Sequence, residues 1–209
     1  MSKISLEPND SGAGTFSIVS PDSNTNRTLN LPDESGILFS DGSGVPGSAV
    51  TGQLASSNMP AGSVIQVVGN TTSTIVSTTS SSFISTGLSA NITPKMPNSK
   101  ILVIVSQPIY IERTSEFGSI LDYRIVRNST EIYRPGFGET GQVIRNATEV
   151  ESSIILSPSV LDSVSVTNEI TYTVEFNCRV SSRGGGVSAQ TDTQQNNLES
   201  SITLMEIAG

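Results

Sequence analysis

The sequence contains no histidine, no tryptophan and a single cysteine, Cys178. Histidine is the usual base in nucleophilic catalysis, a common zinc ligand and the side chain that titrates near neutral pH, so its absence excludes all three uses. A lone cysteine cannot form an internal disulfide. Because Cys178 lies in an apolar strand pattern, we expect it to be a small core residue. We expect no enzyme activity and no cofactor, and we assign no residue as a metal ligand.

Charge is also scarce. Charged residues make up 14% of the chain, against roughly 25% in an average soluble domain. The net charge is −8, and the 11 basic residues are scattered, which argues against nucleic acid and anionic membrane surfaces as partners. No run approaches the ~20 apolar residues of a membrane helix, and the opening Met1–Ser5 has no apolar segment typical of a secretion signal. We expect a protein that is made in a cytoplasm and stays soluble there.

No helical periodicity of useful length occurs, whereas β-branched residues and strand-like alternation are frequent after Ala61. The longest alternation is Glu169–Val180, in which Ile170, Tyr172 and the following even-numbered residues share one face. Strands separated by turn signals predict an all-β, antiparallel, jelly-roll-like β-sandwich. The predicted strands are Ser63–Val68, Ser82–Ser85, Leu88–Ile92, Lys100–Gln107, Ile109–Glu112, Ser119–Arg127, Glu131–Arg134, Glu151–Leu156, Glu169–Val180 and Ser200–Ile207.

Three regions follow from the composition. Residues 1–40 read as short strands joined by turns, and each strand carries only one or two large apolar side chains. Such strands cannot offset a backbone ordering cost of roughly 1–2 kcal/mol per residue, so their core would be completed by other chains. Residues 41–60 are rich in Gly and Ser and form either a flexible linker or an ordered neck. Residues 61–209 are predicted to be the sandwich domain.

The run Ile101–Val105 is apolar on both faces of its predicted strand. A strand with one solvated face alternates, so this run predicts burial on both faces. One face would meet the sandwich core, and the other would meet a neighbouring subunit or a covering loop. On this basis Ile101, Val103 and Val105 are candidates for a trimer interface.

Two loops combine arginine with aromatic residues, which are the types enriched in binding hot spots. They are Glu112–Gly118 and Tyr133–Gly138. The candidate receptor-binding residues are Arg113, Glu116, Phe117, Tyr133, Arg134 and Phe137. The alternative is that Phe117 and Phe137 pack beneath their own loops.

Two further sequence patterns are weaker indications of function. Ser181–Gly186 is rich in glycine but lacks the ending of a phosphate-binding loop, so we interpret it as a flexible connector. Glu149 and Glu151 would share one strand face, where they are either a solvated pair, a glycosidase pair or calcium ligands. The solvated pair is favoured, because nothing else in the sequence supports the other two.

Several short segments at the start, middle and end of the chain resemble motifs of a known protein family. They are Gly14–Ile18, Asn24–Asp33, Ser35–Leu38, Asn58–Val68, Thr86–Lys95, Ser99–Val103 and Ser200–Ile207. The first three resemble a "TNRTLTLPD…GTL" module of phage tail-fibre and other virion appendage proteins. The others resemble the C-terminal domain of fibre-like proteins from marine and cyanobacterial phages.

This resemblance implies a homotrimer on the virion. Its N-terminal region would join the tail, the capsid or another fibre protein, and its C-terminal head would face a glycan or protein of the host surface. A tail fibre, an adaptor and a head-decorating fibre all fit the resemblance, and the family supplies no catalytic residues. A polysaccharide-degrading tailspike fits less well, because such enzymes usually need a long β-helix or another large catalytic domain.

Overall fold

The computed structural model describes residues 55–113, 119–135, 150–179 and 185–209, with a few isolated positions before residue 27. The chain divides into two units, Met1–Thr51 and Gly52–Gly209. The strands predicted in residues 1–40, and the predicted linker as far as residue 54, lie outside the described residues. Among the residues that are described, no helix has the length and apolar composition needed to cross a membrane.

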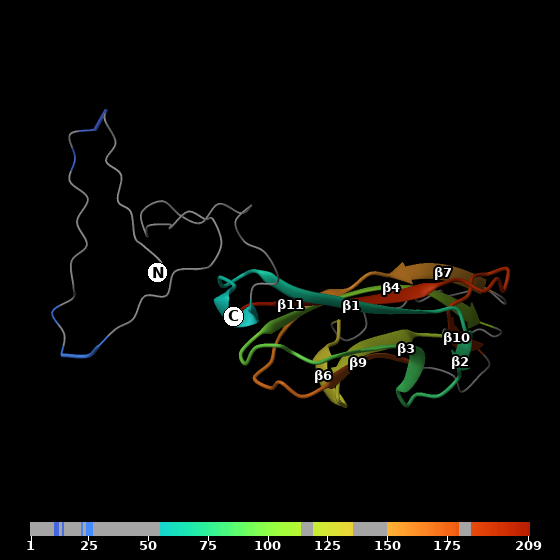
Figure 1. Cartoon of the computed structure of the whole chain (residues 1–209). Coiled ribbons are helices and arrows are strands. Elements are labelled where there is room, and N and C mark those ends of the chain that lie inside the picture. The colour runs from blue at the N-terminus through green and yellow to red at the C-terminus, as the bar shows by residue number, and fades with distance from the viewer. Residues whose placement is uncertain are drawn as a thin grey trace. The chain divides into compact units, whose positions relative to one another are not determined.

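The described part of the second unit is built almost entirely of strands (Figure 1). Its elements are the 3-10 helix η2 (Ser56–Asn58), β1 (Val64–Thr72), β2 (Val76–Thr78), β3 (Ile84–Ile92), β4 (Lys100–Arg113), β5 (Leu121–Arg127), β6 (Thr130–Tyr133), β7 (Val150–Leu156), β8 (Ser159–Ser163), β9 (Ile170–Cys178), β10 (Gly185–Ala189) and β11 (Ser200–Ile207). All the pairings between these strands are antiparallel, and they form two sheets, which confirms the predicted all-β sandwich.

The larger sheet is organised around β4, which is 14 residues long. One edge of β4 pairs with β11 along its first half and with β10 along its second half. The other edge pairs with β8 and then β7, which follow β4 in one continuous register. β1 and β2 complete the sheet outside β11 and β10. The sheet is therefore four strands wide along each half of β4, although it contains seven strand segments.

Pro108 does not interrupt β4, contrary to the break predicted there. The carbonyl of Pro108 accepts a 3.0 Å hydrogen bond from the Gln190 amide, so the proline nitrogen faces the edge occupied by β10 and β11. At this level the chain leaves the sheet between Ala189 and Ser200. A backbone donor would have no ladder partner here, and proline is tolerated because it has none to offer.

The smaller sheet has the order β3-β9-β5-β6. The alternation predicted for Glu169–Val180 is confirmed in β9, where Ile170, Tyr172 and Cys178 are buried, Cys178 completely. Two predicted strands, Ser82–Ser85 and Leu88–Ile92, are one strand, β3. Its register with β9 shifts between Ser85 and Ser89, where Gly87 adopts φ +84, a conformation that favours glycine.

The core between the sheets consists of two hydrophobic clusters. One is centred on Ile101, Val103 and Tyr172, and the other on Ile109, Phe176 and Val187. Between them on β4 lies Gln107, which is fully buried. The side chains of Gln190, Thr86 and Ser200 are also fully buried, so polar groups enter the interior where β10 gives way to β11.

Three strands were not predicted: β2, β8 and β10. Each has three to five residues and pairs at the end of a longer neighbour. β10 begins at Gly185, inside the segment predicted as a connector, and the rest of that connector up to residue 184 lies outside the described residues. β8 and β10 are held by backbone pairing with β4, and β2 by pairing with β10, rather than by a hydrophobic pattern of their own.

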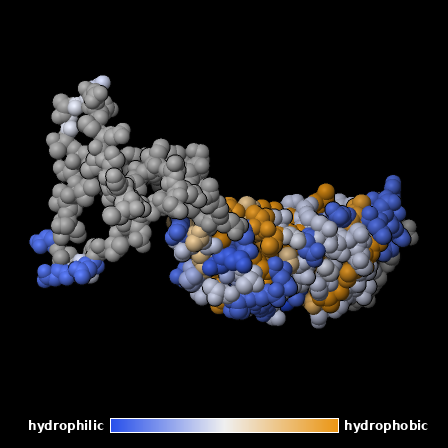
Figure 2. Space-filling model, viewed as in Figure 1, coloured by the Kyte–Doolittle hydropathy of each residue, from blue (hydrophilic) through white to orange (hydrophobic). Residues whose placement is uncertain are grey.

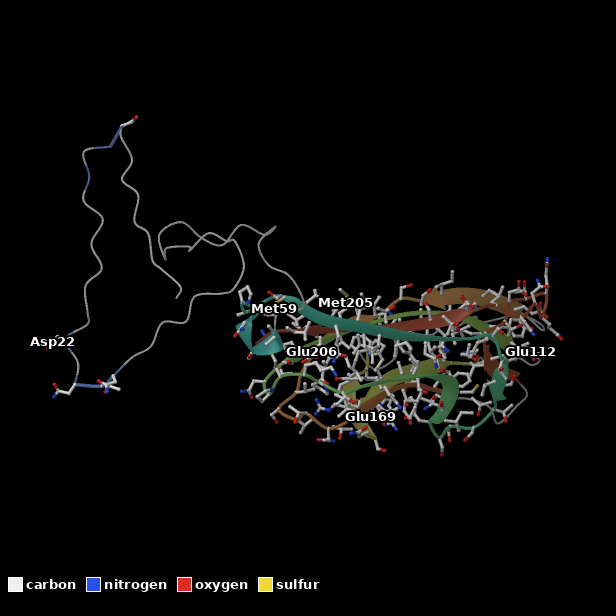
Figure 3. All side chains as sticks on the ribbon, in the orientation of Figure 1. Asp22, Met59, Glu112, Glu169, Met205 and Glu206 are labelled. Atoms are coloured by element: carbon white, nitrogen blue, oxygen red, sulfur yellow. The ribbon has the colours of Figure 1, made fainter. Side chains whose placement is uncertain are left out.

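The two ends of the sandwich carry different segments. At the entry end, the chain enters through residues 55–63 and finishes at Gly209. Gly62 donates to the Ala208 carbonyl there, and Val164 donates to that of Ser99. Toward the opposite end, the loop end, β2, β4, β6 and β9 finish and β3, β5, β7 and β10 begin. Met59 and Glu112 mark these opposite ends in Figure 3.

Candidate functional site

The strands that precede both loops predicted to bind a receptor run toward the loop end. The first follows β4, whose last residue Arg113 pairs with Val150 and Gly185, and the second follows β6. The positions of Glu116, Phe117 and Phe137 lie outside the described residues, and of Arg113 only the backbone is described. The side chains of Tyr133 and Arg134 are described, and both have structural contacts.

Tyr133 is half-buried and packs against both core clusters. Its ring centroid lies 6.2 Å from that of Tyr123, with the ring planes tilted by 43°. Burial, together with a hydrogen bond to Tyr133, raises the pKa of Tyr123 well above its usual value. Tyr133 therefore fastens β6 to the core, and its ring is not freely presented to a ligand.

Arg134 forms a two-pronged ion pair with Asp122. Its Nε lies 3.2 Å from Asp122 Oδ1, and its Nη2 contacts Oδ2. Asp122 is almost completely buried, and its hydrogen bond to the guanidinium raises the pKa of Arg134. The guanidinium carbon also lies 4.9 Å from the ring centroid of Phe83.

A second arginine lies over the same ring. The guanidinium carbon of Arg124 is 4.3 Å from the centroid of Phe83, and Arg124 pairs with Glu175 at 2.7 Å. Each cation–π contact of this kind contributes about 0.5–1 kcal/mol at an exposed site. Sequence reasoning placed Phe83 only at the start of a strand and missed this cluster, because its members come from three segments far apart in the chain.

A shallow hollow of about 380 Å³ lies at the loop end, between β2 and β10. Its lining is rich in hydroxyl groups and glycine, and one carboxylate contributes: Ser77, Thr78, Thr79, Glu112, Gly185, Gly186, Val187 and Ser188. The hydroxyls of Ser77 and Ser188 are 2.8 Å apart, so one donates to the other across the two strands. Hydroxyl and carboxylate groups form hydrogen bonds with neutral polar ligands such as sugars.

The acidic pair that the sequence proposed is not the pair that the structure describes. Glu149 lies outside the described residues, whereas Glu151 is exposed and pairs in register with Glu112. Within the described part of the chain, no group of three or more acidic, His or Cys side chains is placed to hold a metal ion.

The residues proposed for a trimer interface require a correction. Ile101, Val103 and Val105 point into the core of a single chain and are at most 1% exposed, so they are closed to a neighbouring subunit. The other face of this run carries Leu102 and Ile104, and Ile104 is 40% exposed. The burial predicted for both faces of Ile101–Val105 is therefore found on one face only within this chain, because the even-numbered residues of the strand point outward.

Comparison with known proteins gives no family for this chain. A scan against protein-family models finds no match, and a search of the curated proteins finds no significant relative.

Proposed function

We propose that this chain is a structural, non-enzymatic protein of a phage virion, a fibre-like appendage that works as a homotrimer. Its sandwich would present the loop end to the host surface, and its N-terminal region would join it to the particle. The proposal rests on the sequence resemblance described above and on two features of the domain, its strand order and the division of roles between its ends.

The strand order supports a jelly roll. Three pairs of consecutive strands lie end to end and can each be counted as one strand: β1/β2, β7/β8 and β10/β11. Counted in this way, the described part of the chain has eight strands. In chain order, the larger sheet then runs 1-8-3-6 and the smaller sheet 2-7-4-5. This interleaving is the order of a jelly roll, a fold found in viral capsid proteins and lectins. Because one fold serves many functions, the strand order supports the proposal by analogy only.

The observation that carries the host-contact part is the separation of the two ends. The chain enters the domain at the end marked by Met59, whereas the hydroxyl-lined hollow lies toward the end marked by Glu112 (Figure 3). β4 and β6, the strands before the two arginine–aromatic loops, run in that direction. A domain tethered at one end and carrying long connections at the other is suited to presenting those connections outward.

The proposal is tested first by location. Antibody against the purified chain should label the tail appendages of intact virions in electron micrographs. Labelling confined to the capsid would favour a decoration protein, labelling at the tail only after the fibres are removed would favour an adaptor, and no labelling of virions would overturn the proposal.

Host contact is tested separately by binding of the purified full chain to host cells. The double variant Phe117→Ala/Phe137→Ala should bind at least tenfold more weakly, because aromatic anchors carry much of the energy of such contacts. The matched control is Val166→Ala, which removes an exposed apolar side chain from the entry end. Equal binding by wild type and the double variant would place host recognition elsewhere.

A further inference from the structure

One row of side chains crosses the whole outer face of the larger sheet, the face turned away from the smaller sheet. The register aligns Val67 with Met205, Met205 with Leu102, and Leu102 with Leu161, over β1, β11, β4 and β8. We name these four residues the apolar row. Val67 is 55% exposed and Leu161 is 50% exposed. Figure 2 shows hydrophobic residues gathered on the surface where β1 and β11 lie.

Part of the other half of the same outer face is covered by the chain itself. The segment between β10 and β11 crosses it, because the Thr193 amide donates a 3.0 Å hydrogen bond to the Ser153 hydroxyl on β7. Ser153 pairs with Tyr110, and Tyr110 is only 6% exposed although it points outward. The segment therefore covers Tyr110, whereas Ile155 on β7 is 68% exposed and the apolar row on the β8 half stays open.

The open half is also free of acidic groups. On its loop side the apolar row is followed by Gly69, Thr203, Ile104 and Ser159, then by Thr71, Ser201 and Ser106; on its entry side it is followed by Ile207, Lys100 and Ser163. None of these residues is acidic, in a chain whose net charge is −8. Copies of a strongly acidic chain repel one another unless their contact surfaces lack carboxylates, and this face meets that condition.

We infer that this open face is the surface through which copies of the chain pack against one another; the inference rests on the homotrimer proposed above. The apolar row reaches both edge strands, so the Val67 edge of one copy can meet the Leu161 edge of the next. A contact between two different patches of the same chain closes into a ring when the rotation fits, as it does in a trimer.

The size of the face sets its share of the interface. Four strands spaced ~4.8 Å apart and seven residues of β4 rising ~3.4 Å each give a plan area of roughly 450 Å². A stable interface buries about 800 Å² on each partner. The apolar row therefore forms the hydrophobic centre of the contact, and residues outside this face complete it.

The test compares full-length variants by light scattering. Wild type should have three times the 21.9 kDa mass of one chain. Val67→Lys/Leu161→Lys should reduce the mass to that of a single chain, and the control Val166→Lys, at a site 39% exposed, should leave it tripled. A wild-type monomer would overturn the trimer and this inference together. A double variant that stays trimeric would overturn the inference and leave the trimer standing.

A second measurement covers the case in which the double variant misfolds. Thr203→Cys places a thiol beside the apolar row, and the native Cys178 is completely buried and should not react. Maleimide labelling of folded Thr203→Cys should be at least tenfold slower in the trimer than in chains diluted until they dissociate. Equally fast labelling in both states would overturn the inference, and slow labelling in both would assign the cover to another segment of the same chain.

Discussion

The hydroxyl of Ser99 donates a 2.6 Å hydrogen bond to Oε1 of Glu206, which joins the residue before β4 to the last strand inside the sandwich. Glu206 is fully buried, and its carboxylate also accepts hydrogen bonds from the amides of Lys95 and Met96 and from Nε2 of Gln66. One carboxylate thus holds the β3–β4 connection and β1 against β11 at the entry end.

Replacing Glu206 with Gln should destabilise the domain by about 2–4 kcal/mol. The amide presents two donors where the carboxylate accepts only, so some of the surrounding donors lose their partner inside the protein. Chemical denaturation of the full chain measures the change. Glu199→Gln is the matched control, because Glu199 is exposed and precedes the same strand. A loss below 0.5 kcal/mol for Glu206→Gln would contradict the assigned role.

The same carboxylate predicts how stability depends on pH. Burial acts to raise the pKa of Glu206, but the hydrogen bonds from Ser99, Lys95, Gln66 and Met96 outweigh it, so the pKa lies below its usual value. The folded chain then binds this proton less readily than the unfolded chain, and the stabilisation is present above the unfolded pKa of about 4.5. It is lost as the pH falls through the folded pKa. Glu206→Gln should show a weaker decline below pH 4.5 than wild type.

The strands that a sequence predicts well are those with their own hydrophobic period. The alternation of β9 and β11 survives in the structure, and so does the burial of Cys178. β8 and β10 were missed because their pairing along β4 is decided by a strand far away in sequence. The strand break predicted at Pro108 was wrong for a related reason. The donor that proline lacks is not needed there, because β10 and β11 separate beside Pro108.

The candidate site was harder to predict than the fold. That the strands before both arginine–aromatic loops run toward one end follows from the strand order, which no local pattern contains. The sequence makes Arg134 a candidate because arginine is enriched in binding hot spots, yet Arg134 is held by Asp122, 12 residues earlier, and lies over Phe83. A buried acid on a neighbouring strand is invisible in sequence until the register of that strand is known.

Asp162 links the two sheets, and removing its charge should weaken that link. It accepts two hydrogen bonds from Arg127, at 2.9 and 2.7 Å, and one of 2.8 Å from the hydroxyl of the fully buried Tyr172. Asp162→Asn should cost about 1–3 kcal/mol of unfolding free energy, and Tyr172→Phe about 1 kcal/mol. If the double variant loses as much as the sum of the single variants, Asp162 and Tyr172 are not energetically coupled.

Replacing Gln107 with Leu should stabilise the domain. Its side chain is fully buried, and neither its nitrogen nor its oxygen has a hydrogen-bond partner within the described residues. A buried amide without a partner costs about 1–3 kcal/mol, and Leu fills a similar volume between the two core clusters. Gln107→Leu should therefore raise the thermal midpoint, measured by calorimetry. A lower midpoint would mean that the amide is satisfied by ordered solvent and contributes to the native structure.

The ion pairs made by the two arginines over Phe83 should differ sharply in how much they stabilise the domain. Asp122 is 7% exposed, so Arg134→Ala leaves a buried carboxylate without its cation and should destabilise the domain by about 2–3 kcal/mol. Glu131 pairs with Arg124 at 3.3 Å, and its side chain is 40% exposed, so Glu131→Ala should change stability by less than about 0.5 kcal/mol. Urea unfolding of both variants measures the contrast. Arg134→Ala should therefore weaken host-cell binding only through loss of the fold. If Arg134→Ala keeps wild-type stability but binds host cells weakly, Arg134 is instead part of the contact surface.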